Sequence, residues 1–218
     1  MRFLLNPASY DLSDPSSIPN LLWQHLIIVG ISMLIALIIA FPLAILVTRY
    51  RRLYLPVITF TGLLYTIPGI ALLGILVSIF QLSLATVIIP LVIYAQLVLV
   101  RNIAAAINNI DPLLIEVGRA VGMSRGQVFF RVTLPLAMPV IIAGIRIAVV
   151  TTIGIASLAS LVGQGGLGDL IFKSIPFDDK ETIFGGAILI GLFAIVADLL
   201  LLGVQIALNR GRSAVSVA

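Results

Sequence analysis

The chain has 218 residues, of which 61% are hydrophobic and only 10% are charged. A soluble domain carries about 25% charged residues, so this composition excludes an ordinary soluble fold and predicts an integral membrane protein. The sequence has no cysteine and one histidine, His25, which excludes disulfides, thiolate metal sites and a histidine metal cluster within one chain.

The chain is predicted to be an all-α membrane protein with about five transmembrane helices. Residues 1–21 are polar and form an extracytoplasmic N-terminal segment, and residues 209–218 form a cytoplasmic C-terminal tail. Between them, in a single membrane domain over 22–208, five apolar runs are long enough to cross about 30 Å of hydrocarbon. These runs are residues 22–48, 54–80, 83–107, 133–162 and 183–208. They are continuously apolar rather than alternating, which favours helices over barrel strands.

The distribution of charge between the spans predicts their orientation. With the N-terminus outside, the cytoplasmic side receives nine basic residues and two acids, and the outer side receives three basic residues and six acids. Basic residues concentrate in cytoplasmic loops, so the N-terminus is predicted outside and the C-terminus inside. The net charge of +4 then reflects a basic inner face towards lipid headgroups rather than a nucleic-acid partner.

Two charged residues remain within the spans. Arg146 and Asp198 lie near the middle of the last two apolar runs. One interpretation is a structural ion pair that neutralises both charges inside the membrane, and the other is a role in a solute path.

The segment between spans three and four has strong local signals. Asp111 and Pro112 are typical of a helix N-cap and first turn, and Gly122 is typical of a residue that ends a helix with positive φ. Ser124 and Gln127 have the spacing of a capping box, which begins the next helix. Two short helices joined by a glycine turn are therefore predicted, either as an interfacial element on the membrane or as a docking element.

This segment resembles the loop signature of the permeases of binding-protein-dependent ABC importers. The signature has the form E-A-A, three residues, G, nine residues, I-x-L-P. Here Glu116-Val117-Gly118 stands three residues before Gly122, and Val132-Thr133-Leu134-Pro135 follows nine residues later. The spacing matches throughout, with small or apolar residues in place of the two alanines and the isoleucine.

The resemblance implies that the loop forms a short cytoplasmic coupling helix, which docks on an ATPase subunit. The residues it assigns to that contact are Glu116, Gly118, Arg119, Ala120, Gly122, Met123 and Ser124. The chain itself contains no G-x-x-x-x-G-K-[ST] phosphate loop, so ATP and Mg²⁺ are expected on the partner. We expect no catalytic residue, no metal site and no cofactor in this chain, which is thus predicted not to be an enzyme.

Two further stretches resemble the branch of this family that transports glycine betaine, choline, carnitine and related osmoprotectants. One is Tyr65 to Leu73, where Pro68 breaks the hydrogen-bond ladder of the second span. The other runs from Gly144 to Asp169, with many small residues that favour close helix packing or line a pore. The residues assigned to a translocation path or gate are Tyr65, Thr66, Pro68, Ser157, Ser160, Gly165 and Gly166. Gly163 to Gly168 is expected to be a flexible external loop, acting as a gate, a receptor landing site or only a connection.

The resulting hypothesis is a multi-pass permease of a bacterial or archaeal plasma membrane. Its implied partners are a second permease subunit, identical or similar, two cytoplasmic ATPase subunits, an extracytoplasmic solute-binding protein and membrane lipid. No aromatic cage for a quaternary ammonium ion is evident within the spans, and solute selectivity is expected to lie mainly in the binding protein. The alternatives are a permease for another small solute, such as an amino acid of the methionine type, and a self-sufficient secondary transporter.

Overall fold

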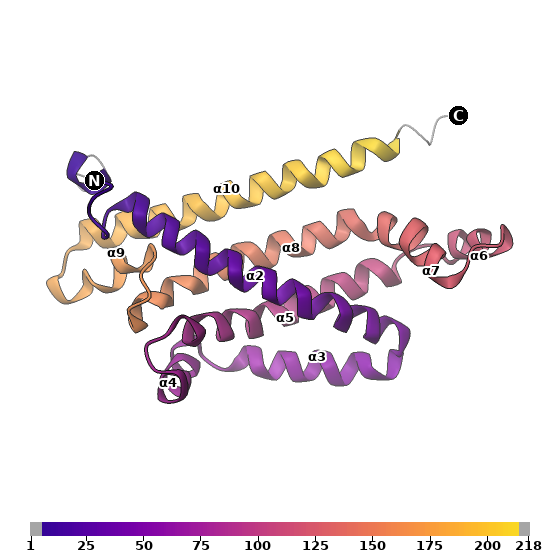
Figure 1. Ribbon diagram of the computed structural model, residues 1–218, viewed down its shortest axis with the longest axis horizontal. Helices are drawn as coiled ribbons and strands as arrows, with labels where there is room; N and C mark the ends of the chain where they lie inside the picture. Colours follow the sequence, from indigo (N-terminus) through magenta and orange to yellow (C-terminus); the bar gives the residue numbers. More distant parts are fainter. Residues whose placement is uncertain (1–5, 214–218) are drawn as a thin grey trace.

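The computed structural model describes residues 6–213, and this part of the chain is built of helices and their connections. In Figure 1 the long helices run roughly side by side along one axis. The elements in chain order are η1 (Pro7–Tyr10), α2 (Ile18–Arg49), α3 (Arg51–Thr66), α4 (Gly69–Phe80), α5 (Leu84–Asn108), α6 (Pro112–Ala120), α7 (Arg125–Val128), η2 (Phe129–Thr133), α8 (Leu134–Ala156), η3 (Ser157–Val162), α9 (Gly168–Phe172), η4 (Ile175–Phe177) and α10 (Lys180–Ser213).

Four helical segments are long and apolar enough to cross a membrane, which confirms the predicted all-α membrane fold. They are α2, α5, the stretch Arg125–Val162 and the part of α10 from Lys180 to Leu208. The helix α2 begins four residues before the predicted span, because Pro19 can occupy the first turn of a helix. The predicted tail over 209–218 is partly helical, since α10 continues to Ser213, and residues 1–5 and 214–218 lie outside the described part.

The predicted second span, 54–80, is not one helix. It consists of α3 and α4, which meet at an angle of 89° around Ile67 and Pro68. Ile67 has φ −67° and ψ 125°, the extended conformation that a following proline imposes. The 16 residues of α3 rise only about 24 Å, less than the hydrocarbon core of a bilayer. The span count is therefore four, or five if the bent pair is counted as one span.

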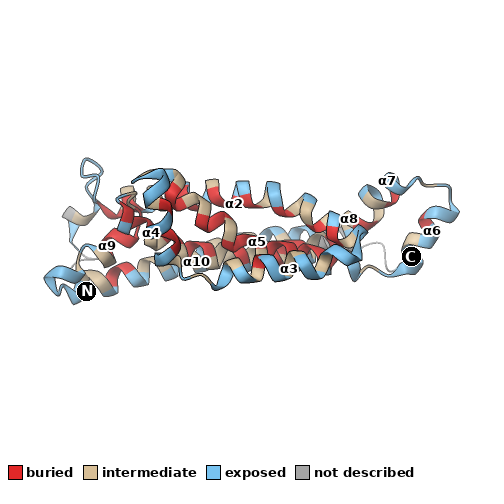
Figure 2. Ribbon diagram, turned by 90° about the horizontal axis from the view of Figure 1, so that it is seen from below, coloured by how far each residue is buried: buried red, intermediate tan, exposed pale blue. Residues whose placement is uncertain are grey.

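The core lies along α5, which packs against α2 on one side and α8 on another. Three alanines spaced four residues apart on α2, namely Ala36, Ala40 and Ala44, are fully buried and allow close helix approach. Figure 2 shows the buried residues gathered on the facing sides of these helices. Large apolar side chains remain exposed on α3 and α10, the arrangement expected where lipid is the solvent.

The two ends of the bundle are formed by different segments of the chain. The N-terminal segment and α9 lie at one end, and α6, α7 and the turn between α2 and α3 lie at the other (Figure 1). Arg49, Arg51 and Arg52 of that turn therefore share an end with the predicted coupling helix. The assignment of this end to the cytoplasm rests on the charge distribution and stays a prediction.

Candidate functional site

The loop between α5 and α8 is held by local hydrogen bonds. The Asp111 carboxylate accepts a hydrogen bond from the Leu113 N–H at 2.9 Å and caps α6. At the other end of α6, Gly122 has φ +85°. Its N–H donates to the Arg119 carbonyl, and the Met123 N–H donates to the Gly118 carbonyl. These two bonds are the Schellman pattern, which satisfies the last carbonyls of a helix.

The second half of the loop folds back on the first. The Ser124 hydroxyl accepts from the Gln127 N–H, and the Gln127 side chain accepts from the Ser124 N–H, so the predicted capping box is present. A Cβ on Gly118 would lie 3.3 Å from a methyl of Val128, so a glycine lets α6 pack closely on α7. The loop is therefore a compact hairpin of two short helices, which continues through the π-helical turn η2 into α8.

One face of this hairpin is exposed and apolar. Leu113, Val117 and Val121 stand four residues apart along α6 and its C-cap, and they are 61%, 52% and 68% exposed. We call these three residues the α6 stripe. Of the seven residues assigned to ATPase contact, five are exposed, namely Glu116, Arg119, Ala120, Gly122 and Ser124. Met123 is half-buried, and Gly118 is buried inside the hairpin, so we treat Gly118 as a packing residue rather than a contact.

The bend between α3 and α4 forms a second feature. The Tyr94 hydroxyl of α5 donates to the Ile67 carbonyl at 2.8 Å, which satisfies a carbonyl released by the break. The rings of Tyr65 and Tyr94 meet edge to face, with centroids 5.6 Å apart. An open pocket of about 270 Å³ lies beside them. Its walls include Tyr65, Thr66, Pro68, Tyr94, Ile155 and Leu158. Tyr65, Thr66 and Pro68 are thus brought together.

The end of α8 contributes to this pocket through neighbours of the predicted path residues. Leu158 and Ile155 line it, while the Ser157 hydroxyl donates to the Gly154 carbonyl at 2.8 Å. Ser160 is buried, and its hydroxyl has no hydrogen-bond partner within the described residues. The structure therefore places Ser157 beside the pocket and Ser160 in the core.

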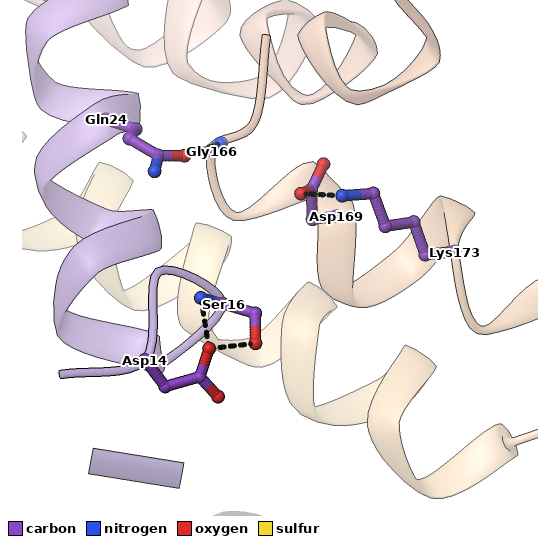
Figure 3. A network of polar contacts seen from close by, with 6 residues as sticks. All are labelled: Asp14, Ser16, Gln24, Gly166, Asp169 and Lys173. Carbon is purple, nitrogen blue, oxygen red and sulfur yellow. Dashed lines mark hydrogen bonds and ion pairs between the residues drawn. The ribbon is translucent and has the colours of Figure 1, made fainter. Parts of the chain in front are cut away.

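Gly165 and Gly166 lie away from this pocket, against the N-terminal part of α2. The Gly166 N–H donates to the Gln24 side chain at 3.0 Å, and the Leu167 N–H donates to Nδ1 of His25 at 3.2 Å. Gly165 has φ +73°, a conformation that favours glycine, and a Cβ there would also force the Gln24 side chain to move. Figure 3 shows Gln24 of α2 directed at Gly166. The expectation of a flexible loop is therefore wrong for this stretch, because side chains of α2 hold it in place.

His25 is a residue whose part in this region sequence reasoning missed. It is fully buried, and its Nε2–H donates to the Ile153 carbonyl at 3.0 Å while Nδ1 accepts from Leu167. A carbonyl can only accept and an amide can only donate, so both ring nitrogens are assigned in the neutral form. The available signal was the adjacent polar pair Gln24 and His25 at the start of an apolar run, because a buried polar side chain usually has a hydrogen-bond partner.

Charged groups surround this loop. Lys173 forms an ion pair with Asp169 one turn earlier on α9, as Figure 3 shows. In the segment before α2, hydrogen bonds from the Ser16 hydroxyl and N–H hold the pKa of Asp14 below its usual range. Ser16, Gln24, Asp169 and Lys173 border an open polar pocket of about 320 Å³ at this end of the bundle.

Arg146 and Asp198 form a two-pronged ion pair. Nε of Arg146 donates to Oδ1 of Asp198 at 2.8 Å, and an Nη donates to Oδ2 at 2.7 Å. The other Nη donates to the Gln205 side chain at 2.8 Å. The contact joins α8 to α10 and satisfies most of the donors of the guanidinium.

Comparisons with known proteins find a family model and relatives that match most of the chain. The family model described as "Binding-protein-dependent transport system inner membrane component" matches residues 32–213. The osmoprotectant import permease protein OsmW of Salmonella typhimurium is 38% identical over 210 residues, covering 94% of this chain and 98% of the relative. The glycine betaine/carnitine/choline transport system permease protein OpuCD of Bacillus subtilis is 39% identical over 202 residues, covering 92% of this chain and 88% of the relative.

Among solved structures, an inward-facing conformation of the MetNI methionine ABC transporter is similar in fold. Its TM-score is 0.74 at 24% sequence identity, and the match covers 85% of this chain and 93% of that chain. At this level of identity the likeness concerns the fold alone.

Proposed function

The chain belongs to the family of binding-protein-dependent transport system inner membrane components, and we propose that the solute it passes is an osmoprotectant of the glycine betaine, choline or carnitine type. Membership makes the chain the non-catalytic, multi-pass inner membrane permease of an ATP-driven importer. Such a permease works with an ATPase and a binding protein. The family match argues against the alternative of a self-sufficient secondary transporter.

The observation that carries the solute proposal is the nearly full-length similarity to permeases named for these solutes. Besides the two described above, a choline transport system permease of Bacillus subtilis is 35% identical over 210 residues. Glycine betaine, choline and carnitine share a trimethylammonium group, so one permease can pass all three if it tolerates differences at the other end of the molecule.

We propose further that two permease subunits form the solute path. In each of them, the hairpin of α6 and α7 docks on one ATPase subunit. The α6 stripe supports this, because an apolar face on a rigid hairpin fits a groove on a protein partner. The ordered hairpin joins directly to α8, so a movement of the ATPase would reach α8 and the helices packed on it. ATP and Mg²⁺ would bind on the ATPase.

The test is uptake by the complete system. The permease, its ATPase and its binding protein are produced in cells that lack other osmoprotectant importers, and uptake of radiolabelled glycine betaine, choline, carnitine and methionine is measured. The proposal predicts ATP-dependent uptake of at least one trimethylammonium solute and none of methionine. Uptake of methionine alone would show that this permease serves amino acids, the alternative that shares this fold.

A further inference from the structure

The pocket at the bend of α3 and α4 has the chemistry of a weak cation site. Tyr65 and Tyr94 both line the pocket; Tyr65 is 40% exposed, whereas Tyr94 is buried and its hydroxyl donates to the Ile67 carbonyl. In an edge-to-face pair only one face of one ring is covered by the partner ring. Tyr65 is the more exposed ring of the pair, and its contact with Tyr94 helps to hold it in place.

The tyrosine rings, rather than charged groups, give the pocket its preference for a cation. None of the residues that line it is charged at neutral pH. The C-terminal end of α3 carries a partial negative charge and the N-terminal end of α4 a partial positive one. Because the two ends meet at the bend, their effects on the pocket largely cancel. What remains is the negative face of the aromatic rings, which attracts a cation that has little hydration to lose.

We propose that Tyr65, supported by Tyr94, forms a transient binding site for the trimethylammonium group of the solute as it passes through the permease. This inference rests on the proposed function and adds the residues that contact the solute. The other walls, Pro68, Ile155 and Leu158, supply apolar contact for the methyl groups. Because no counter-ion is present, the site binds weakly, as a passage requires, and accepts a cation such as choline and a zwitterion such as glycine betaine alike.

Two observations make the pocket more than a packing defect. Gly69 leaves just enough room for Leu158, since a Cβ there would stand 2.8 Å from it. The Tyr94 hydroxyl is anchored 27 residues away in the chain, at the carbonyl that the break exposes. The bend, the ring pair and the end of α8 are thus positioned by one another, which preorganises a site.

The test uses the complete importer in proteoliposomes with choline and glycine betaine as probes. Replacing Tyr65→Leu removes the ring and keeps an apolar side chain, and Tyr65→Phe keeps the ring. The matched control is Phe60→Leu, an aromatic residue on α3 that is 63% exposed and does not line the pocket. Loss of one cation–π contact is expected to lower the uptake rate about 3- to 10-fold in Tyr65→Leu, with Tyr65→Phe and Phe60→Leu near the parent.

A second series separates the electrostatic role from a structural one. Phenylalanine with one, two or three fluorine atoms is incorporated at position 65, which weakens the negative face of the ring with little change in its size. A stepwise fall of the logarithm of the uptake rate with each fluorine supports the site. A flat series, with uptake of both probes intact, overturns the site and leaves the proposed function standing. A parent importer that carries neither choline, glycine betaine nor carnitine overturns the proposed function and this site together.

Discussion

His25 donates a hydrogen bond from Nε2 to the carbonyl oxygen of Ile153 at 3.0 Å, across 128 residues of sequence. Its other ring nitrogen accepts from Leu167, so one buried side chain joins α2, α8 and the glycine loop that follows η3. The loop also reaches the connection between α4 and α5, where the Gln164 side chain donates to the Leu82 carbonyl at 2.9 Å. The end of the permease that holds α9 is therefore one hydrogen-bonded unit rather than a set of independent loops.

Replacing His25→Ala is expected to destabilise this unit. The Ile153 carbonyl and the Leu167 N–H would both lose their buried hydrogen bond to His25, at a cost of about 1–3 kcal/mol. For a chain of this size, the midpoint of thermal unfolding in detergent is expected to fall by about 2–12 °C. The neighbouring Trp23→Ala, at a residue that is 61% exposed, is the control. Equal midpoints for His25→Ala and the parent would contradict the role assigned to His25.

The ion pair of Arg146 and Asp198 allows a test of its two interpretations. Each single change, Arg146→Leu or Asp198→Leu, leaves one charge within the helices without its partner and is expected to lower the yield of folded protein strongly. The double variant removes both charges and is expected to recover much of that yield. If the pair is structural, the recovered protein also transports solute. A double variant that folds but has lost uptake would instead assign the pair to the solute path.

The α6 stripe is expected to tolerate charge in the isolated permease and not in the complex. Val117→Glu introduces a better helix former at an exposed position, so folding of the permease should not be impaired. A charge in the centre of an apolar contact is expected to weaken ATPase binding about tenfold or more, measured by co-purification at several permease concentrations. Phe177→Glu is the control, because Phe177 is 83% exposed in η4, far along the chain from the stripe. Full ATPase retention by Val117→Glu would place the docking surface elsewhere.

Asp179 gives a prediction about pH. Its carboxylate accepts hydrogen bonds from the Thr182 hydroxyl and N–H at the start of α10, which holds the pKa of Asp179 below its usual range. A lowered pKa means that the contribution to folding is complete above the ordinary value near 3.8 and is lost as the pH falls through the lowered value. Below about pH 4 the first turn of α10 should therefore loosen.

Hydrogen exchange of residues 178–184, compared between the parent and Asp179→Asn at each pH, measures this effect. The parent should be better protected than the variant at pH 6, and the difference should shrink as the pH falls towards 3. Such a comparison cancels the intrinsic pH dependence of exchange. A difference that stays constant over this range would mean that Asp179 acts without its charge.

The hairpin of α6 and α7 shows what local sequence signals predict. Asp111, Gly122 and the pair Ser124 and Gln127 act on neighbours two to four residues away, and each was found in its predicted role. The inward orientation of Gly118 was not predicted, because it depends on the packing of α6 on Val128 rather than on α6 itself.

The bend at Pro68 marks the boundary between the two kinds of information. A proline in an apolar run predicts a broken ladder, which is a local property of the backbone. The angle of 89° is not local, since α4 turns to a position where Tyr94 of another helix meets the freed carbonyl. The tyrosine pair that results was likewise hidden, because Tyr65 and Tyr94 lie on separate helices.

The sequence by itself determined that the protein is helical and lies in a membrane, and which residues turn in the loop between α5 and α8. The resemblance of that loop to a known signature indicated the family. The helical membrane fold follows from hydropathy over each span, and the turn follows from capping residues that act over a few residues. Only the tertiary structure decided that the glycine loop is held by His25, that Arg146 reaches both Asp198 and Gln205, and that two tyrosines share a pocket wall. Contacts of this kind join residues far apart in the chain, and their partners are set by how the helices pack.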